Sequence, residues 1–420
     1  MRPLLLNTFE IGGGAAIATN RLHKGLRSIG VDSQLLVQSK KTDDRTVIGS
    51  STKIGKAIAM LRPHLDALFV WSYRKKGKGL FSPANLYDGL AAKIDEINPD
   101  LVHLFWVAGG FLKIETIKKI KRPIIWTLHD MWLFTGGCHY DDECGKFKDS
   151  CGSCPLLQSS NNQDLSRRIW LRKQKYWGNV PIVVVATSHW LANMARASSL
   201  FKDKRIEVLP NGLDTDKYKP SDKIVARSVY NFPINKKLIL FSAFGATSDK
   251  RKGNQFLLPA LEKLSQEGWR DMAELVIIGS SEPENPPDFG MKVHYMGHLH
   301  DEISQVLLYS AADVVVAPSM QENLSNTVME SLACGTPVVA FNIGGMPDMI
   351  EHKENGFLAT PFDFISLAEG ISWVLSDENK HQRLSNRARS LVVERFKLDV
   401  VAKQYAALYQ DVLQSFGGIR

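Results

Sequence analysis

The feature that most constrains the fold is a pattern of short apolar segments, each followed by a Gly or polar turn and a helical stretch, which occurs twice. In the first half, the apolar segments are residues 3–9, 33–38, 100–106, 123–129, 181–187 and 205–210. In the second half, they are residues 237–244, 274–279, 292–297, 313–318 and 337–342. Continuous apolar strands that alternate with helices are typical of a parallel sheet covered on both faces. The sequence therefore predicts an α/β protein with two doubly wound parallel sheets.

A segment rich in turn-forming residues, LPNGLDTDKYKP at 209–220, separates the two patterns. We expect an N-terminal domain over residues 1–205 and a C-terminal domain over residues 206–395, since 420 residues are too many for one hydrophobic core. We expect a last helix, within residues 396–420, to pack back on the N-terminal domain. Ligands of doubly wound sheets bind outside the carboxyl ends of the strands, so functional residues should follow strands and face a cleft between the domains.

Composition and hydropathy exclude several classes of protein. Hydrophobic residues make up 44% of the chain and charged residues 23%, as in ordinary globular proteins. No apolar segment is long enough to span a bilayer, and the apolar run at residues 3–6 is too short for the core of a signal peptide. We therefore expect a cytoplasmic protein. Nucleic acid is not an expected partner, because the chain has no zinc-finger spacing, RNA-recognition signature or helix-turn-helix pattern.

Residues 51–80 are basic, aromatic and amphipathic. They hold seven basic residues against one acid, Asp66, whereas the whole chain carries a formal net charge of only +8. Such a stretch can lie on an anionic membrane surface, which would place the protein on the inner face of a membrane. The alternative is a solvated helix whose apolar face packs on its own domain. The basic residues are Lys53, Lys56, Arg62, Arg74, Lys75, Lys76 and Lys78.

Residues 313–350 carry the strongest functional signal. A buried strand ends at Pro318, and Glu322 lies in the polar loop that follows it. Ser325 is placed to cap a helix that contains Glu330. The N–H groups at a helix start suit a phosphate, and a carboxylate can accept hydrogen bonds from both hydroxyls of a ribose. The alternative is a surface helix with two ordinary glutamates.

This segment resembles the E-x7-E signature of glycosyltransferase family 4, whose members are retaining enzymes of the GT-B fold. Residues 127–132, Thr-Leu-His-Asp-Met-Trp, and the cysteine segment after them resemble the colanic-acid and exopolysaccharide type within that family. The resemblance implies two Rossmann-like domains and covers nearly the whole chain. The other matching features are Gly13-Gly14, residues 209–214, Lys252-Gly253, residues 333–339 and Gly344-Gly345.

The resemblance also implies an activity. It is the transfer of a hexose-type sugar from a nucleotide-diphosphate sugar to a glycan or lipid-linked glycan, in surface polysaccharide biosynthesis. No cofactor is expected for catalysis, and the chain has no Asp-x-Asp pair after a strand. A glycosidase that uses Glu322 and Glu330 is disfavoured, because the nearby lysines and the helix start favour a phosphate ligand. A nucleotide-sugar epimerase and a non-catalytic nucleotide-sugar or glycan binder remain open.

By resemblance, the catalytic candidates are His129, Asp130 and Glu322. His129 would face the donor sugar, Glu322 would contact its hydroxyls, Glu330 would hold the ribose, and Lys252 would neutralise the diphosphate. One departure is Ala246, where the family has an Arg; we expect Lys250 or Arg251 to supply that charge. The candidates for donor binding are Gly13, Gly14, Lys250, Arg251, Lys252, Asn323, Leu324, Ser325 and Glu330.

Four of the five cysteines follow His129-Asp130 closely. They are Cys138, Cys144, Cys151 and Cys154. In a reducing compartment, clustered thiols are more often metal ligands than disulfides. Four thiolates would make a closed tetrahedral zinc site with a structural role. The alternative is a set of reduced or redox-active thiols.

Overall fold

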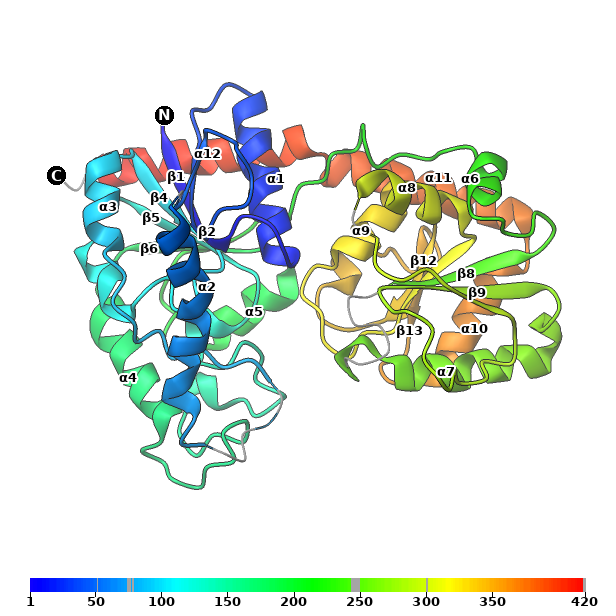
Figure 1. Cartoon of the computed structure of the whole chain (residues 1–420), viewed down its shortest axis with the longest axis horizontal. Coiled ribbons are helices and arrows are strands. Elements are labelled where there is room, and N and C mark those ends of the chain that lie inside the picture. Colours follow the sequence, from blue (N-terminus) through cyan, green and yellow to red (C-terminus); the bar gives the residue numbers. More distant parts are fainter. Residues whose placement is uncertain (51, 74–76, 78, 243–249, 300, 418–420) are drawn as a thin grey trace. The chain divides into compact units, whose positions relative to one another are not determined.

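The computed structural model of the chain describes residues 1–420 apart from 51, 74–76, 78, 243–249, 300 and 418–420 (Figure 1). The chain forms two compact units. The first comprises Met1–Gly212 together with Val401–Arg420, and the second comprises Leu213–Val400.

The first unit contains a seven-stranded parallel sheet in the order β3-β2-β1-β4-β5-β6-β7. Its strands are β1 (Pro3–Phe9), β2 (Gln34–Ser39), β3 (Val47–Ile48), β4 (Leu101–Leu104), β5 (Ile124–Leu128), β6 (Ile182–Ala186) and β7 (Ile206–Val208). Its α-helices are α1 (Gly14–Ser28), α2 (Lys53–Ala67), α3 (Leu90–Ile97), α4 (Leu165–Trp177), α5 (His189–Ala197) and, from Val401 on, α12 (Leu398–Gly417). Its short 3-10 helices are η1 (Leu68–Val70), η2 (Ile114–Lys119), η3 (Trp132–Phe134) and η4 (Lys146–Lys148).

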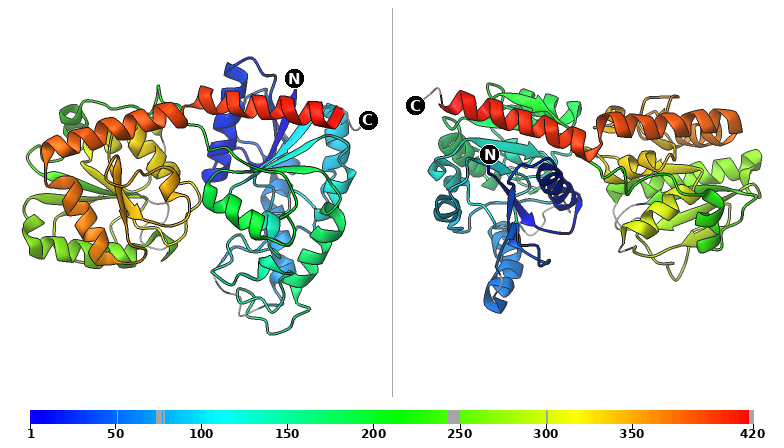
Figure 2. Two further views of the ribbon diagram at one scale, coloured as in Figure 1. Left: turned by 180° about the vertical axis from the view of Figure 1, so that it is seen from behind. Right: turned by 90° about the horizontal axis from the view of Figure 1, so that it is seen from above.

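Side chains of β1 alternate between the two faces of this sheet, so both faces need a helical cover. Leu4 and Leu6 belong to one hydrophobic cluster, whereas Leu5 belongs to another. The second cluster includes Tyr405 and Tyr409 of α12, which lies along the sheet of the first unit (Figure 2). The last helix of the chain is therefore part of the cover of the first sheet.

The second unit contains a six-stranded parallel sheet in the order β10-β9-β8-β11-β12-β13. Its strands are β8 (Lys237–Ser242), β9 (Ala273–Ile278), β10 (Val293–Tyr295), β11 (Val314–Ala317), β12 (Val338–Phe341) and β13 (Gly356–Ala359). Its α-helices are α6 (Lys223–Val229), α7 (Asn254–Leu264), α8 (Glu302–Ala311), α9 (Asn326–Ala333), α10 (Phe364–Leu375) and α11 (Glu378–Arg395). Its short helices are η5 (Lys250–Lys252), η6 (Ser265–Trp269) and η7 (Met346–Asp348).

The prediction of two doubly wound parallel sheets is confirmed. Two edge strands, β3 and β13, were not predicted, because β3 has two residues and β13 begins with Gly. The units meet between Gly212 and Leu213, later in the chain than the predicted boundary between residues 205 and 206. The reason is that β7 pairs with β6 and so belongs to the first sheet.

Candidate functional site

In the second unit, the strand order reverses between β8 and β11, so the carboxyl ends of these strands mark the expected ligand site. A loop follows β11 and leads to α9, which begins at Asn326. The Ser325 side chain accepts a hydrogen bond from the Val328 amide, which confirms the predicted helix cap. Ala246 lies with residues 243–249 outside the described part of the chain.

The loop around η5 packs closely on the segment after β11. The Met320 amide donates a hydrogen bond to the Arg251 carbonyl at 2.7 Å. Gly253 has φ +78°, and a Cβ there would come within 1.7 Å of the Pro318 carbonyl oxygen. Only glycine fits this conformation and this approach. The basic η5 segment, which begins at Lys250, is thereby held against the carboxyl end of β11.

Lys252, a predicted donor-binding residue, and Glu322, a catalytic candidate, form an ion pair. Lys252 Nζ lies 2.8 Å from Glu322 Oε2, and the side chains are 28% and 17% exposed. The Gly345 amide donates to the Glu322 carbonyl at 3.3 Å. Gly344 has φ +52°, and a Cβ there would come within 1.9 Å of the same carbonyl oxygen. The Gly-Gly pair after β12 therefore fixes the backbone that carries Glu322.

Glu330, in the interior of α9, is buried and interacts with a tyrosine that the sequence did not single out. The Tyr309 hydroxyl donates to Glu330 Oε2 at 3.3 Å. Burial, followed by the charge of Glu330, raises the pKa of Tyr309 well above its ordinary value, so this hydroxyl stays protonated. Nearby, Asn323, Leu324 and Ser325 are also buried. The second unit thus holds Arg251 and Lys252 against the loop that carries Glu322, Asn323, Leu324 and Ser325, and this loop leads into the helix of Glu330.

The other predicted residues lie in the first unit. Gly13 is the N-cap of α1, and its φ of 82° favours glycine, while a Cβ there would meet nothing within 4 Å. Gly14 is the first residue of that helix. His129 and Asp130 directly follow β5. The first unit therefore offers one helix start and one strand end as candidate ligand positions.

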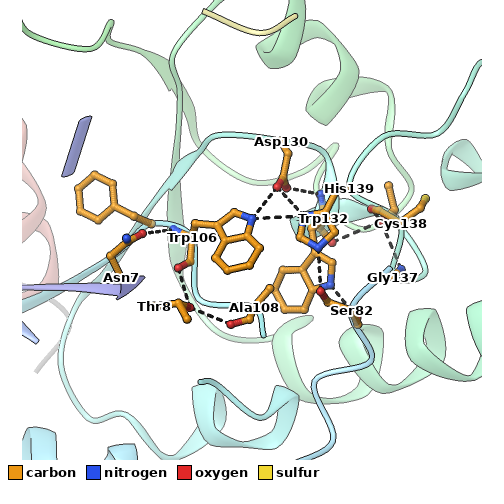
Figure 3. A network of polar contacts seen from close by, with 12 residues as sticks. Asn7, Thr8, Ser82, Trp106, Ala108, Asp130, Trp132, Gly137, Cys138 and His139 are labelled. Carbon is orange, nitrogen blue, oxygen red and sulfur yellow. Dashed lines mark hydrogen bonds and ion pairs between the residues drawn. The ribbon is translucent and has the colours of Figure 1, made fainter. Parts of the chain in front are cut away.

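The Asp130 carboxylate is the centre of a polar network (Figure 3). Its Oδ2 accepts from Trp106 Nε1 at 2.9 Å and contacts His139 Nδ1 at 2.5 Å. Its Oδ1 accepts from the Trp132 amide at 2.9 Å. Burial alone would raise the pKa of Asp130, but the charge of His139 and these hydrogen bonds lower it below its usual range. Asp130 is thus an ionised carboxylate at neutral pH.

His129 lies beside this network and is neutral at physiological pH. Burial lowers its pKa to about 4, although the charge of Asp130 opposes the shift. Its ring stacks on Phe105 with centroids 5.9 Å apart. His129, Asp130, Trp106 and Trp132 help to line a small cavity at the carboxyl ends of β4 and β5. A neutral imidazole there can exchange hydrogen bonds with a ligand without adding charge.

The sequence did not single out Trp106, Ser82, His139 or Tyr309 as functional residues. Trp106 could have been found, because it is the last residue of a predicted strand and strand ends carry ligand-binding residues. Ser82 and Tyr309 have no such local signal.

All five cysteines are free. Burial raises the pKa of the four clustered thiols, to about 12 for Cys151, so they are protonated at neutral pH. Within the described residues, which include all four, no group of three or more His, Cys, Asp or Glu side chains is arranged to hold a metal ion. Zinc binding by Cys138, Cys144, Cys151 and Cys154 stays a prediction that would require this loop to rearrange.

A buried lysine supports the turn after Asp130. Lys173 is fully buried, and its Nζ donates to the Trp132 carbonyl and, at 3.0 Å, to the Thr135 carbonyl. The same nitrogen lies 4.0 Å from the centroid of the Trp132 ring. Burial lowers the pKa of Lys173 to about 7. The lysine therefore ties α4 to the segment that carries Trp132.

We expect Lys173→Met to change how stability depends on pH. The unfolded lysine titrates near 10.4, so between about pH 7 and 10 the unfolded chain binds more protons than the folded one. Stability of the wild type should therefore rise with pH in this window, by on the order of 2–4 kcal/mol relative to the variant. Denaturant unfolding of both proteins at several pH values measures this. If the unfolding free energies of the two proteins change with pH in parallel, the pKa of Lys173 is not lowered.

Helix α2 exposes its apolar side chains. Ile54, Ile58, Leu61 and Leu65 share one face and are 45–75% exposed. Only Ala59 and Asp66 of this helix are buried. The interpretation that this apolar face packs on its own domain is therefore wrong.

Polar contacts hold the inner face of α2 instead. Arg62 Nε donates to Gln38 Oε1 at 3.0 Å and to the Gly110 carbonyl at 2.8 Å. Asp66 accepts from the amides of Ala84 and Asn85. Arg74, Lys75, Lys76 and Lys78 lie outside the described residues. In the described part of the chain, no helix combines the length and apolarity needed to cross a membrane.

Two models of known protein families match the sequence of this chain. The model described as Glycosyltransferase Family 4 matches residues 12–217, and the model described as Glycosyl transferases group 1 matches residues 236–377. N-acetyl-alpha-D-glucosaminyl L-malate synthase of Bacillus anthracis is 27% identical over 55% of this chain and 60% of its own length. D-inositol 3-phosphate glycosyltransferase of Corynebacterium efficiens is 26% identical over 78% of this chain and 79% of its own. Three of the curated relatives are matched over only 51–60% of their length.

Solved structures share the fold. Sucrose-phosphate synthase from Thermosynechococcus elongatus has a TM-score of 0.70 at 19% identity, covering 99% of this chain and 100% of that one. Anabaena HepE in complex with UDP-glucose has a TM-score of 0.62 at 18% identity, covering 98% of this chain and 100% of that one. At such identities the likeness concerns the arrangement of helices and strands alone.

Proposed function

Because this chain belongs to glycosyltransferase family 4 and has the GT-B fold, we propose that it is a retaining hexosyltransferase. Its donor would be a nucleotide-diphosphate sugar, and its acceptor a glycan or lipid-linked glycan in surface polysaccharide biosynthesis. The observation that carries this proposal is the ion pair between Lys252 and Glu322, in a loop that leads directly into α9, the helix of the buried Glu330. The donor in the HepE complex, UDP-glucose, and the similarity to a capsular polysaccharide glycosyltransferase of Staphylococcus aureus support the class of substrate.

Different residues of the second unit would bind different parts of the donor. Glu330 would accept hydrogen bonds from the two ribose hydroxyls, and Glu322 from the hydroxyls of the transferred sugar. The amides of Asn323, Leu324 and Ser325 would meet the phosphate or the sugar. Lys250, Arg251 and Lys252 would neutralise the diphosphate, whose negative charge grows as the glycosidic bond breaks.

Two further roles fall to the first unit. Gly13 and Gly14 would let the backbone approach the phosphate, and neutral His129 with ionised Asp130 would contact the sugar. No step needs a metal, because the basic residues and helix start supply the positive potential. The leaving phosphate oxygen would accept the proton of the acceptor hydroxyl.

Calorimetric titration of the purified protein with UDP and with GDP tests the donor site. We expect micromolar binding of one nucleotide and about 10- to 100-fold weaker binding by Glu330→Gln, because hydrogen bonds to a charged group contribute about 1.5–3 kcal/mol. Glu354→Gln, which changes an exposed glutamate of the same unit, is the matched control. Binding of neither nucleotide, or equal binding by Glu330→Gln, would contradict the proposal.

Product analysis separates the alternatives once the nucleotide is known. A transferase releases the nucleoside diphosphate and extends an acceptor. An epimerase converts the nucleotide sugar into its epimer with no acceptor present. A protein that only binds the nucleotide sugar or the glycan gives neither product.

We further propose that the protein acts in the cytoplasm as a peripheral protein on the inner face of a membrane, which it contacts through residues 51–80. The exposed apolar row of α2 supports this, since an interfacial helix buries such a face at the headgroup boundary. Lys53 and Lys56 at the start of α2 add attraction to anionic lipid.

We expect the protein to sediment with vesicles that contain anionic phospholipid and much less with zwitterionic vesicles. The double variant Ile58→Glu with Leu61→Glu should lose at least tenfold in vesicle affinity, because burial of one such side chain contributes about 1.5–3 kcal/mol. Ile224→Glu, at an exposed position of α6 in the second unit, is the control. Undiminished sedimentation of the double variant would exclude α2 as the contact.

A further inference from the structure

We propose that Ser82 and His139 are positioning residues, which through a hydrogen-bonded chain hold the Asp130 carboxylate in place beside His129 (Figure 3). The function of Asp130 in sugar transfer rests on the proposed function. The chain itself rests on geometry and can be tested separately.

The three side chains are connected in series. Ser82 Oγ lies 2.8 Å from His139 Nε2, and His139 Nδ1 lies 2.5 Å from Asp130 Oδ2. Because an ionised carboxylate can only accept, Nδ1 must carry a proton. The hydrogen bond between Nε2 and Ser82 Oγ can then run in either direction, because the hydroxyl can both donate and accept. The partners on both sides thus fix one ring orientation.

The backbone holds the two ends of this chain in register. The Ser82 amide donates to the Gly137 carbonyl at 2.8 Å, and the His139 amide donates to the Leu80 carbonyl at 3.2 Å. These bonds flank an antiparallel bridge between Phe81 and Cys138. The segment after the basic stretch is thereby joined to the first cysteine of the cysteine segment.

Two tryptophans enclose the His139 ring. Its centroid lies 5.5 Å from that of Trp106 and 6.4 Å from that of Trp132. Trp132 Nε1 also donates to the Ser82 carbonyl at 2.8 Å, and Trp106 Nε1 donates to Asp130. Trp132 therefore stacks on the ring and binds Ser82 through its N–H group, whereas the Trp106 N–H group lies near both Asp130 Oδ2 and His139 Nδ1.

Burial decides which end of the hydrogen-bonded series Ser82–His139–Asp130 faces a ligand. Ser82 and His139 are 4% and 3% exposed, so the serine is not a nucleophile for an outside substrate. The Asp130 side chain is 14% exposed and, with His129, lines the small cavity. The order is therefore Ser82, His139, Asp130 and then the ligand. An anionic carboxylate held in this way is suited to accept a hydrogen bond from a sugar hydroxyl.

Two substitutions at His139 separate its two nitrogens. Asparagine places an amide N–H near the position of Nδ1, so His139→Asn keeps a donor for Asp130. Glutamine places its amide near the position of Nε2, so His139→Gln keeps only the contact with Ser82. Asp130→Asn removes the charged acceptor, and Ser82→Ala removes the far end of the chain.

The first readout is a proton spectrum of the full-length protein with 15N-labelled histidine. We expect a strongly deshielded imidazole N–H resonance in the wild type, because the hydrogen bond to the carboxylate is short and charge-assisted. It should persist in Ser82→Ala and vanish in Asp130→Asn and His139→Gln, with thermal unfolding as the check that each variant folds. Absence of the resonance in the wild type, or its persistence in Asp130→Asn, would contradict the proposed hydrogen bond between His139 and Asp130.

The second readout is the pH dependence of kcat/KM for transfer. In His139→Gln, the ionised Asp130 carboxylate loses a hydrogen bond that stabilises it, so the pKa of Asp130 rises. The acid limb of the pH profile of kcat/KM should therefore move up by about one pH unit or more. His139→Asn should restore the wild-type position. An unmoved limb in an active His139→Gln would overturn the positioning role. A protein that shows the resonance but transfers no sugar would refute the proposed function instead.

Discussion

Asp313→Ala should destabilise the second unit by about 3–5 kcal/mol, because it leaves a buried arginine without its counter-charge. Asp313 is 2% exposed and directly precedes β11, one of the two central strands. Its Oδ2 lies 2.6 Å from a terminal nitrogen of Arg227 and accepts from the Leu238 amide, also at 2.6 Å. Lys223 Nζ lies 2.5 Å from the other oxygen. One carboxylate therefore joins α6 to the start of β8.

Denaturant unfolding of the full chain measures this effect. Asp271→Ala, at an exposed position of the same unit, is the control and should change the unfolding free energy by less than about 0.5 kcal/mol. A loss of under about 1 kcal/mol in Asp313→Ala would mean that water or another group compensates Arg227.

The same interaction should weaken in acid. Burial alone would raise the pKa of Asp313, but Lys223 and Arg227 hold it below its ordinary value. A carboxyl group with a lowered folded-state pKa contributes its full stability above its unfolded pKa, near 3.9, and loses it as the pH falls through the folded value. The difference between wild type and Asp313→Ala should therefore be constant above about pH 5 and shrink below pH 4.

Gly344→Ala should abolish nucleotide binding in the calorimetric assay, a loss of at least about 100-fold or 2.7 kcal/mol. A Cβ at Gly344 would come within 1.9 Å of the Glu322 carbonyl oxygen, so the loop between β11 and α9 has to move. The Glu322 carbonyl cannot move away easily, because the Gly345 amide donates a hydrogen bond to it. The displacement would carry Glu322 away from Lys252.

Gly297→Ala is a matched control for backbone strain. Gly297 has φ +62°, close to the +52° of Gly344, but a Cβ there would meet nothing within 4 Å. Both variants thus carry the cost of a left-handed alanine, about 1 kcal/mol, while only Gly344→Ala adds the clash. Normal nucleotide binding by Gly344→Ala would show that this contact does not position the donor loop.

The parts of the fold that could be predicted depend on signals local in the sequence. Most strands lie within apolar segments that are visible in the sequence, whereas β3 and β13 do not. The start of α9 depends on Ser325, three residues before the amide that it caps. The chain from Ser82 to Asp130 could not be predicted. Ser82 and His139 are 57 residues apart and meet only through the bridge between Phe81 and Cys138.

The orientation of α2 could not be predicted for a different reason. An amphipathic pattern has the same period whether its apolar face is buried or exposed. The structure decides the matter through Arg62 and Asp66, whose hydrogen bonds place the polar side inward. No spacing rule distinguishes an inward charged residue that makes hydrogen bonds from an outward one.

The place of α12 in the cover of the first sheet has a consequence for synthesis on the ribosome. Residues 1–212 emerge first. In the folded protein, His103 Nδ1 of that sheet lies 2.6 Å from the Tyr409 hydroxyl, and this contact can form only after the whole second unit has been made. Until then, the apolar cluster on this face of the sheet lacks the side chains of Val401, Tyr405 and Tyr409. The second unit, which is one continuous segment, can complete its fold while the first still waits for its last helix.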